Sequence, residues 1–537
     1  MPASANTPKL LAKATALSKV GDDNSGVSPV RIYQGSSDTF NSFHAHDSCY
    51  TVRFFSAICN IPRDEALKYM SRLKKANSTE AIYILEDIER DGFIPDVFHY
   101  SAAISKCAKD GKLDEAKKIL RQMKKNKVSP NEVTMNSLID ACAHVGNDKE
   151  AIKFLREMEE EHDLWPNVLS YSSAISACGK AGNWEKAIEL LREMQNRGVE
   201  PNVISYSSAI SACEKGGQTE QALQLLVEME NRGIEVDEVT FNAAISACGK
   251  GGAKHTETAL ALFREMCNRG VWPNVISYNT TISACEKGGA EYTDTALQLF
   301  EEMKEYGVEP TVITYSATIS ACEKGGAKYT QAALGIFDEL QEKKISPTEI
   351  TFSALISACG KSGDKYVDVA LRHFNEMKGL GISPGEITYT AIIKTCYDNK
   401  RYPEALESVE EAISTGFLSP LEAESEEWDL HQLREAEACM LIANALVASV
   451  DTVCFKDIRL VTGRGKTSLE LRGEGPVLQL KVPAFIRDVA GLQLSPEIKH
   501  GKLNEGAFIL TKTALKKWAK SDDFDRFRAL MTGKKKE

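Results

Sequence analysis

Residues 168–202 read VLSYSSAISACGKAGNWEKAIELLREMQNRGVEPN, and the spacing of the apolar residues in this stretch decides the fold. Tyr171, Ile175 and Cys178 stand at i, i+4 and i+7, the spacing of residues that share one face of a helix. A second apolar face of the same kind consists of Ala187, Leu190, Leu191 and Met194. The stretch therefore predicts two short helices, each with one buried face.

Small polar residues and glycines mark where these helices begin and end. Ser170 is placed to cap the first helix and Gly182 to end it, and Pro201 closes the unit before the next one begins. The equivalent caps in later units are Ser205, Thr240, Ser277, Thr314, Thr351 and Thr388.

The two-helix unit recurs along the chain. Nine of the 14 cysteines fall at positions 107, 142, 178, 213, 248, 285, 322, 359 and 396, in steps of 35 to 37 residues. A fixed period of this length is typical of a solenoid, in which each unit covers the apolar face of its neighbour. The cysteine lies on the same helix face as the tyrosine and isoleucine, so we interpret it as a core residue and not as part of a metal or redox array.

We place nine units and a degenerate capping unit. The capping unit is 62–96, and the nine units are 97–131, 132–167, 168–202, 203–237, 238–274, 275–311, 312–348, 349–385 and 386–420. The units of 37 residues carry their two extra residues between the helices, where an insertion lengthens a turn and leaves the core unchanged.

Composition limits the classes of function. The 537 residues carry a formal net charge of -11, so the protein does not coat nucleic acid by bulk charge, and any phosphate contact needs a local basic line. The longest nearly apolar stretch, 438–450, is shorter than the ~20 residues that a membrane helix needs, so we predict no membrane span. The first 21 residues resemble a weak transit peptide for a chloroplast or mitochondrion, and a solvated tail explains them equally well.

Residues 62–420 resemble the pentatricopeptide repeat (PPR) family. The stretches VITYSATISACEKGG at 312–326 and GVEPNVISYSSAI at 198–210 are close to the pattern of that family. The nearest rival, the tetratricopeptide repeat, has a W-x2-L-G-x2-Y signature that this chain lacks. The resemblance implies an all-α solenoid that binds single-stranded RNA with one base for each repeat and no cofactor.

In that scheme the fifth and last residues of each repeat face the base edge. The pairs are Ser101 with Asn131, Asn136 with Asn167, Ser172 with Asn202, Ser207 with Asp237, Asn242 with Asn274, Asn279 with Thr311, Ser316 with Thr348, Ser353 with Gly385, and Thr390 with Leu421 or Pro420. The fifth position holds only Ser, Thr or Asn. An alternative explanation is that polar residues suit the exposed face of a first helical turn.

The family's pairing preferences imply the RNA sequence 5'-A-Y-A-G-Y-Y-R-R-R. The last four positions depart from the usual Asn and Asp pairs. The second residue of each repeat would wedge beside the base, although it could equally be a packing residue. These residues are Phe98, Val133, Leu169, Ile204, Val239, Ile276, Ile313, Ile350 and Ile387.

Because the net charge of the chain is negative, phosphate contacts would need a local group of basic residues, and lysines at one repeat position supply it. Stacked repeats would turn lysines at one repeat position into a stripe that follows a phosphate backbone, unless each is an ordinary solvated lysine. They are Lys109, Lys180, Lys215, Lys250, Lys287, Lys324 and Lys361.

After the acidic linker at 421–427, helix and strand patterns alternate, as in a small α/β layer domain. Residues 428–518 resemble a small MutS-related (SMR) domain. The resemblance rests on Asp429-Leu430-His431, on Thr462-Gly463-Arg464-Gly465 and on NEGAFILTKTALKKW at 504–518. The remaining residues, 519–537, are assigned to a C-terminal tail.

Some members of the SMR family cleave nucleic acid. Asp429 and His431 would project to one face of an extended segment, where one could hold a metal and the other move a proton. The glycine turn offers backbone N–H groups, Arg464 and Lys466 for a phosphate. A capped strand end explains Asp429 and His431 without catalysis, so cleavage and binding alone both stay open, and a divalent metal is expected only with cleavage.

The sequence thus predicts an organellar RNA-binding protein with a helical solenoid and a C-terminal SMR-like module. Its partners would be a single-stranded organellar transcript and other RNA-processing proteins. The alternative is a helical-repeat scaffold that binds peptides without RNA specificity. Exchanging the fifth-position residues should change RNA choice and leave a peptide groove intact.

Overall fold

The computed structural model describes residues 61–421, 425–430, 433–449, 457–462, 477–492, 494–499 and 502–533. The N-terminal tail and its predicted transit peptide therefore lie almost entirely outside the described residues. The chain forms two compact units, one ending at Ala284 and the other beginning at Cys285. Among the described residues, no helix is both long and apolar enough to cross a membrane.

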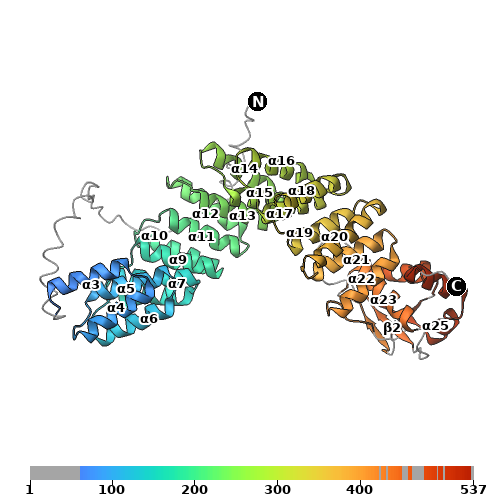
Figure 1. Cartoon of the computed structure of the whole chain (residues 1–537), viewed down its shortest axis with the longest axis horizontal. Helices are drawn as coiled ribbons and strands as arrows, with labels where there is room; N and C mark the ends of the chain where they lie inside the picture. Colours follow the sequence, from blue (N-terminus) through green and yellow to red (C-terminus); the bar gives the residue numbers. More distant parts are fainter. Residues whose placement is uncertain are drawn as a thin grey trace. The chain divides into compact units, whose positions relative to one another are not determined.

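The first unit consists of successive helix pairs (Figure 1). They are α3 (Arg63–Lys75) and α4 (Ser78–Arg90), α5 (Val97–Lys109) and α6 (Leu113–Lys125), α7 (Glu132–Val145) and α8 (Asp148–Glu160), α9 (Val168–Ala181) and α10 (Trp184–Asn196), α11 (Val203–Lys215) and α12 (Thr219–Asn231), α13 (Glu238–Lys250) and α14 (Thr256–Asn268), followed by α15 (Val275–Gly288), which runs into the second unit. The prediction of two helices in each repeat is confirmed here.

The first helices of neighbouring repeats pack directly on one another. In this unit α5, α7, α9, α11 and α13 form one layer, and each second helix packs on the first helices of its own and the following repeat. The expected buried faces are present, since Tyr171, Ile175 and Cys178 have no exposed surface. Each repeat therefore completes the core of the one before it.

The repeat cysteines are core residues, as the sequence predicted. All nine are buried and reduced, and burial raises the pKa of the Cys213 thiol to about 11 and that of Cys248 to about 12. A raised pKa keeps these thiols protonated at neutral pH, and the thiolate is the form that binds metals and attacks disulfides.

The helix caps differ from the prediction. The cap of α9 is Asn167 and not Ser170, because the Asn167 side chain accepts from Ser170 N while Ser170 Oγ receives the Asn167 N–H at 3.1 Å. Asn202 and Ser205 form the same reciprocal pair at the start of α11. The helices thus begin three residues earlier than expected, and the last residue of one repeat starts the first helix of the next.

The second unit continues with α16 (Thr293–Glu305), α17 (Val312–Gly325), α18 (Thr330–Glu342), α19 (Glu349–Gly360), α20 (Val367–Gly379), α21 (Glu386–Asp398) and α22 (Tyr402–Ser414). The two extra residues of the 37-residue repeats lie in short 3-10 turns between paired helices, as predicted. These turns are Ala253–His255 in the first unit and Ala290–Tyr292, Ala327–Tyr329 and Asp364–Tyr366 in the second.

The C-terminal module belongs to the second unit and shares its core. Helix α23 (Glu435–Ser449) packs on α21 and α22, and the Phe485 ring of α24 (Val477–Asp488) lies 6.0 Å from the Tyr397 ring of α21. Its four-stranded sheet has the order β1-β2-β4-β3, with strands β1 (Glu427–Asp429), β2 (Ile458–Val461), β3 (Ser495–Lys499) and β4 (Lys502–Leu510). Strands β1 and β2 are parallel, and β4 runs antiparallel to β2 and β3.

Ordered structure continues into the stretch that the sequence analysis assigned to a C-terminal tail. After α25 (Lys512–Trp518), α26 (Asp522–Thr532) packs against α22. Phe524, Phe527 and Met531 recur at helical spacing and are buried. This apolar face fixes α26 to the last repeat.

The burial of the repeat cysteines predicts their reactivity. At pH 8 in the native protein, N-ethylmaleimide should modify the exposed Cys267 rapidly and leave Cys213 and Cys248 largely unmodified, because burial blocks access and keeps both thiols protonated. Mass spectrometry of the labelled peptides would measure this. Rapid labelling of Cys213 without denaturant would contradict it, and unfolding in urea should make all three reactive.

Candidate nucleic-acid interface

In both units, the first helix of each repeat carries one exposed apolar side chain near its start. All nine second-position residues are exposed, from 45% for Phe98 to 67% for Ile387. From the sequence, these residues could either pack in the core or contact a base. Core packing is now excluded, because a packed side chain would be covered. Apolar exposure at one register of every repeat is typical of a binding surface.

In four repeats the fifth-position serine forms a polar link to the next repeat. Ser101 Oγ lies 2.7 Å from Thr134 Oγ1, and Ser172 Oγ lies 2.7 Å from Ser205 Oγ. In the second unit, Ser316 pairs with Thr351 and Ser353 with Thr388, both at 2.7 Å. Each link joins a fifth residue to the third residue of the following repeat, so neighbouring first helices are held in fixed register.

The structure brings fifth and last residues together in two repeats. Ser101 Oγ donates to Asn131 Oδ1 at 3.1 Å, and Ser172 Oγ donates to Asn202 Oδ1 at 3.4 Å. Because the same Asn oxygens cap the next helix, the Nδ2 amide is the part of each side chain that remains as a donor. Asp237 caps α13 through Oδ1 at 2.8 Å and has only acceptor atoms.

Two fifth-position asparagines carry unsatisfied oxygens. The Oδ1 atoms of Asn242 and Asn279 are buried and accept no hydrogen bond from any residue that the structure describes. A buried polar atom without a partner costs about 1–3 kcal/mol, so both asparagines lower the stability of their repeats. The unsatisfied atoms stand at the positions that the sequence analysis assigned to base recognition.

The predicted lysine row is exposed but partly neutralised. Lys250 Nζ lies 2.7 Å from Glu214, and Lys361 Nζ lies 2.5 Å from Glu323, which also pairs with Lys324 at 3.2 Å. Both glutamates directly precede the lysine of their own repeat, so the sequence itself contains the signal for this pairing. Phosphates would therefore have to compete with carboxylates at these lysines.

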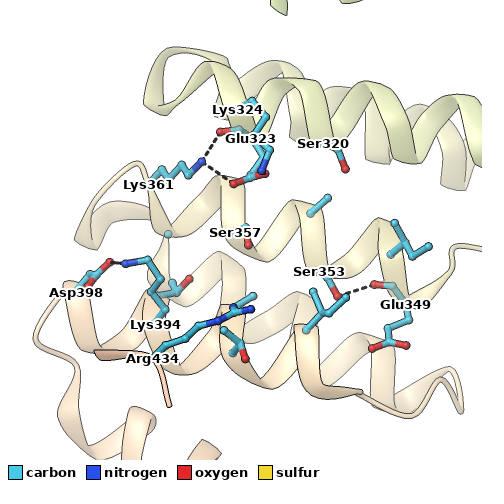
Figure 2. A pocket seen from close by; sticks show the side chains of 17 residues that line it. Ser320, Glu323, Lys324, Glu349, Ser353, Ser357, Lys361, Lys394, Asp398 and Arg434 are labelled. Atoms are coloured by element: carbon cyan, nitrogen blue, oxygen red, sulfur yellow. Dashed lines mark hydrogen bonds and ion pairs between the residues drawn. The ribbon is translucent and has the colours of Figure 1, made fainter. Parts of the chain in front are cut away.

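A cleft of about 420 Å³ in the second unit collects all three residue classes (Figure 2). Its lining includes Ser353 and Thr390, the second-position residues Ile350 and Ile387, and the lysines Lys324 and Lys361. Arg434, which precedes α23 of the C-terminal module, also points into this cleft (Figure 2). It forms no ion pair with the part of the chain that the structure describes.

The ninth repeat is bonded to the C-terminal module. Thr390 Oγ1 donates to Glu437 Oε1 at 2.5 Å, and Glu437 Oε2 accepts from Arg434 N at 3.0 Å. Thr390 and Glu437 are both buried. A base could use the Thr390 hydroxyl only after this contact had broken.

The two SMR-like motifs begin at one edge of the sheet. Asp429 is the last residue of β1 and pairs in register with Val461, the last residue of β2, and Leu430 N donates to Val461 O at 2.8 Å. Thr462, which follows, is buried. His431 and the turn residues Gly463, Arg464, Gly465 and Lys466 lie outside the described residues, so their arrangement stays a prediction. Within the described ranges, no cluster of three or more His, Cys, Asp or Glu side chains could hold a metal.

Family models match the repeats without a gap. The pentacotripeptide-repeat region of PRORP matches residues 65–221 and 317–421, a pentatricopeptide repeat domain matches 261–324, the PPR repeat family matches 209–250, and a PPR repeat matches 239–271. Together they match 65–421. The chain belongs to the pentatricopeptide repeat family. None of these models reaches the SMR-like module. No curated protein sequence gives a significant match.

Solved structures similar to this PPR protein include PPR10 from maize, at 22% identity and a TM-score of 0.42, with 72% of this chain and 56% of that chain covered. PPR10 in complex with an 18-nt psaJ RNA element shows 19% identity and a TM-score of 0.42, with 65% and 60% covered. Yeast Rmd9p in complex with a 16-nt target RNA shows 12% identity and a TM-score of 0.36, with 80% and 94% covered. The PPR protein spans 60% or less of the PPR10 chains.

The bond between the module and the last repeat predicts a stability effect. Glu437→Ala should destabilise the second unit by about 1–3 kcal/mol, because it leaves the buried Thr390 hydroxyl without its acceptor. Urea unfolding followed by tryptophan fluorescence would measure this, since Trp428 and Trp518 are buried in the module. Glu407→Ala, at an exposed site of α22, is the matched control. Equal stability of the two variants would contradict the prediction.

Proposed function

We propose that this PPR protein binds single-stranded RNA and selects its sequence through the repeats. The observation that carries the proposal is the exposed apolar side chain at the second position of all nine repeats, whose fifth residues are small and polar. Bases present flat apolar faces and polar edges, so such a surface offers each base one contact of each kind.

The caps supply a chemical basis for selection. At Asn131 and Asn202 the cap uses the side-chain oxygen, which leaves the Nδ2 amide to donate to a base acceptor. At Asp237 the cap uses one carboxylate oxygen, which leaves an acceptor for the N–H groups of guanine. This difference supports the expected preference for A beside Asn and G beside Asp.

A peptide-binding scaffold is the competing function. Exposed apolar side chains would also suit a peptide, but a peptide does not explain why the fifth position is restricted to Ser, Thr and Asn. This restriction favours a ligand with polar edges at a regular spacing. An RNA chain has that property.

For the module we propose an SMR-like role in binding or cleaving the selected RNA. The parallel pairing of β1 and β2 supports it, because Asp429 and Thr462 then follow neighbouring strands at the same sheet edge. We further propose that the protein acts in a chloroplast or mitochondrion on an organellar transcript. A fluorescent fusion carrying residues 1–60 would test that location.

The selection proposal predicts a switch in base preference. Asp237→Asn should change the preferred base at the fourth RNA position from G to A, by about tenfold, because the amide keeps the cap and replaces the outward acceptor by a donor. Selection from a random RNA pool, followed by sequencing, would measure it. Asp338→Asn, at an exposed site of α18, is the control. An unchanged fourth position would contradict base reading by this pair.

The cleavage proposal predicts that His431→Ala abolishes RNA cleavage and leaves RNA affinity within about twofold, since the repeats supply the binding surface. Time courses on the selected RNA, with and without Mg²⁺, would be compared with fluorescence anisotropy. Cleavage at the original rate would remove His431 from the mechanism.

A further inference from the structure

The eighth repeat lacks a side chain at its last position. Gly385 stands where the first seven repeats have Asn, Asp or Thr, and it is the N-cap residue of α21 without a capping side chain. The expected reader pair of this repeat, Ser353 with Gly385, is therefore incomplete.

Glu349, the first residue of the same repeat, fills the vacant place. Its Oε1 accepts from Gly385 N at 2.9 Å and from Thr388 Oγ1 at 3.2 Å. A Cβ atom added to Gly385 would overlap Glu349 Oε1. The carboxylate thus occupies the space of a last-position side chain and bonds to the start of the next helix.

In two other repeats, a first-position glutamate also contacts the last residue of its own repeat. Glu132 accepts from the Nδ2 amide of Asn167, and Glu238 accepts from the Nδ2 amide of Asn274. In each case a first-position glutamate reaches the last residue of its own repeat. Where that residue is glycine, the glutamate takes its place.

The surroundings of Glu349 form a complete base position. Glu349 and Ser353 line the same cleft, together with the wedges Ile350 and Ile387 (Figure 2). Glu349 Oε2 accepts no hydrogen bond from the residues that the structure describes. The cleft volume of about 420 Å³ falls in the range of small-ligand sites, about 300–1,000 Å³.

We propose that Glu349 is the specificity-determining residue of the eighth repeat and selects guanine at the eighth RNA position. This inference rests on the proposed function, and it narrows the purine expected there to one base. A carboxylate can only accept hydrogen bonds, and guanine has two adjacent donors, N1–H and N2–H₂, on its Watson–Crick edge. Adenine, cytosine and uracil each place an acceptor beside their donor, which would face the carboxylate.

The test is RNA selection from a random pool with the full chain and three variants. Glu349→Gln should reduce the guanine preference at the eighth position by about tenfold and leave other positions unchanged. The double variant Glu349→Val with Gly385→Asn copies the arrangement of Val168 and Asn202 in the third repeat, and should prefer adenine. Glu342→Gln, exposed at the end of α18, is the control. Each variant's melting temperature should match that of the unmodified protein.

The outcomes separate this inference from the proposed function. Selection of bases at the third and fourth positions, with an eighth position that Glu349→Gln does not change, would overturn the role of Glu349 and leave RNA reading intact. No base preference at any position in the unmodified protein would overturn both. A guanine preference lost only in Glu349→Gln and converted to adenine in the double variant would establish the proposal.

Discussion

The bond between the last side chain of one repeat and the first helical turn of the next is the interaction on which this structure depends. At Asn202 the oxygen accepts the Ser205 N–H at 3.0 Å, and Ser205 Oγ in turn meets Ser172 Oγ of the preceding repeat. One short network therefore caps a helix, sets the register between repeats and orients the two predicted reader residues. The residues that stabilise the helix start are thus the same residues that the sequence predicts to contact a base.

This shared use explains which substitutions the repeats tolerate. A last-position residue needs an acceptor for the helix, so Asn, Asp and Thr all satisfy the cap while presenting different groups to a ligand. Glycine satisfies neither need by itself. In the eighth repeat Glu349 supplies the acceptor from the first position, which keeps the helix start intact at Gly385.

The fold was largely predictable from sequence because each repeat is a local pattern. The spacing of Tyr171, Ile175 and Cys178 identifies a buried face without any knowledge of distant contacts. The caps were placed three residues too late, because Ser170 and Asn167 are both good capping residues and only the backbone shows which one precedes the helix. Helix α26 was missed because its apolar face, with Phe524 and Phe527, needs α22 to cover it.

Sequence identified candidate site residues that recur at one position of each repeat. It did not identify contacts between residues of different repeats or between a repeat and the C-terminal module. The repeat register identified the second-position residues as candidates, but only the structure showed that they are exposed. The hydrogen bond between Thr390 and Glu437 joins the ninth repeat to the C-terminal module over 47 positions, so no repeat pattern predicts it. The sequence does show that Glu132, Glu238 and Glu349 each begin a repeat. It does not show that the side chain of such a glutamate contacts the last residue of its own repeat, because that contact depends on the folded backbone.

The charges of the protein determine how such a surface could bind RNA. The net charge is -11, and Glu214 and Glu323 already pair with lysines of the predicted basic row. Phosphate binding gains affinity by releasing counterions, and a lysine that must first leave a carboxylate gains less. Affinity would then depend mainly on the apolar wedges and the polar readers. The contacts to the bases distinguish one base from another, whereas contacts to phosphates do not. If the protein binds RNA as proposed, its acidic charge would weaken binding to RNA in general more than binding to a matching sequence.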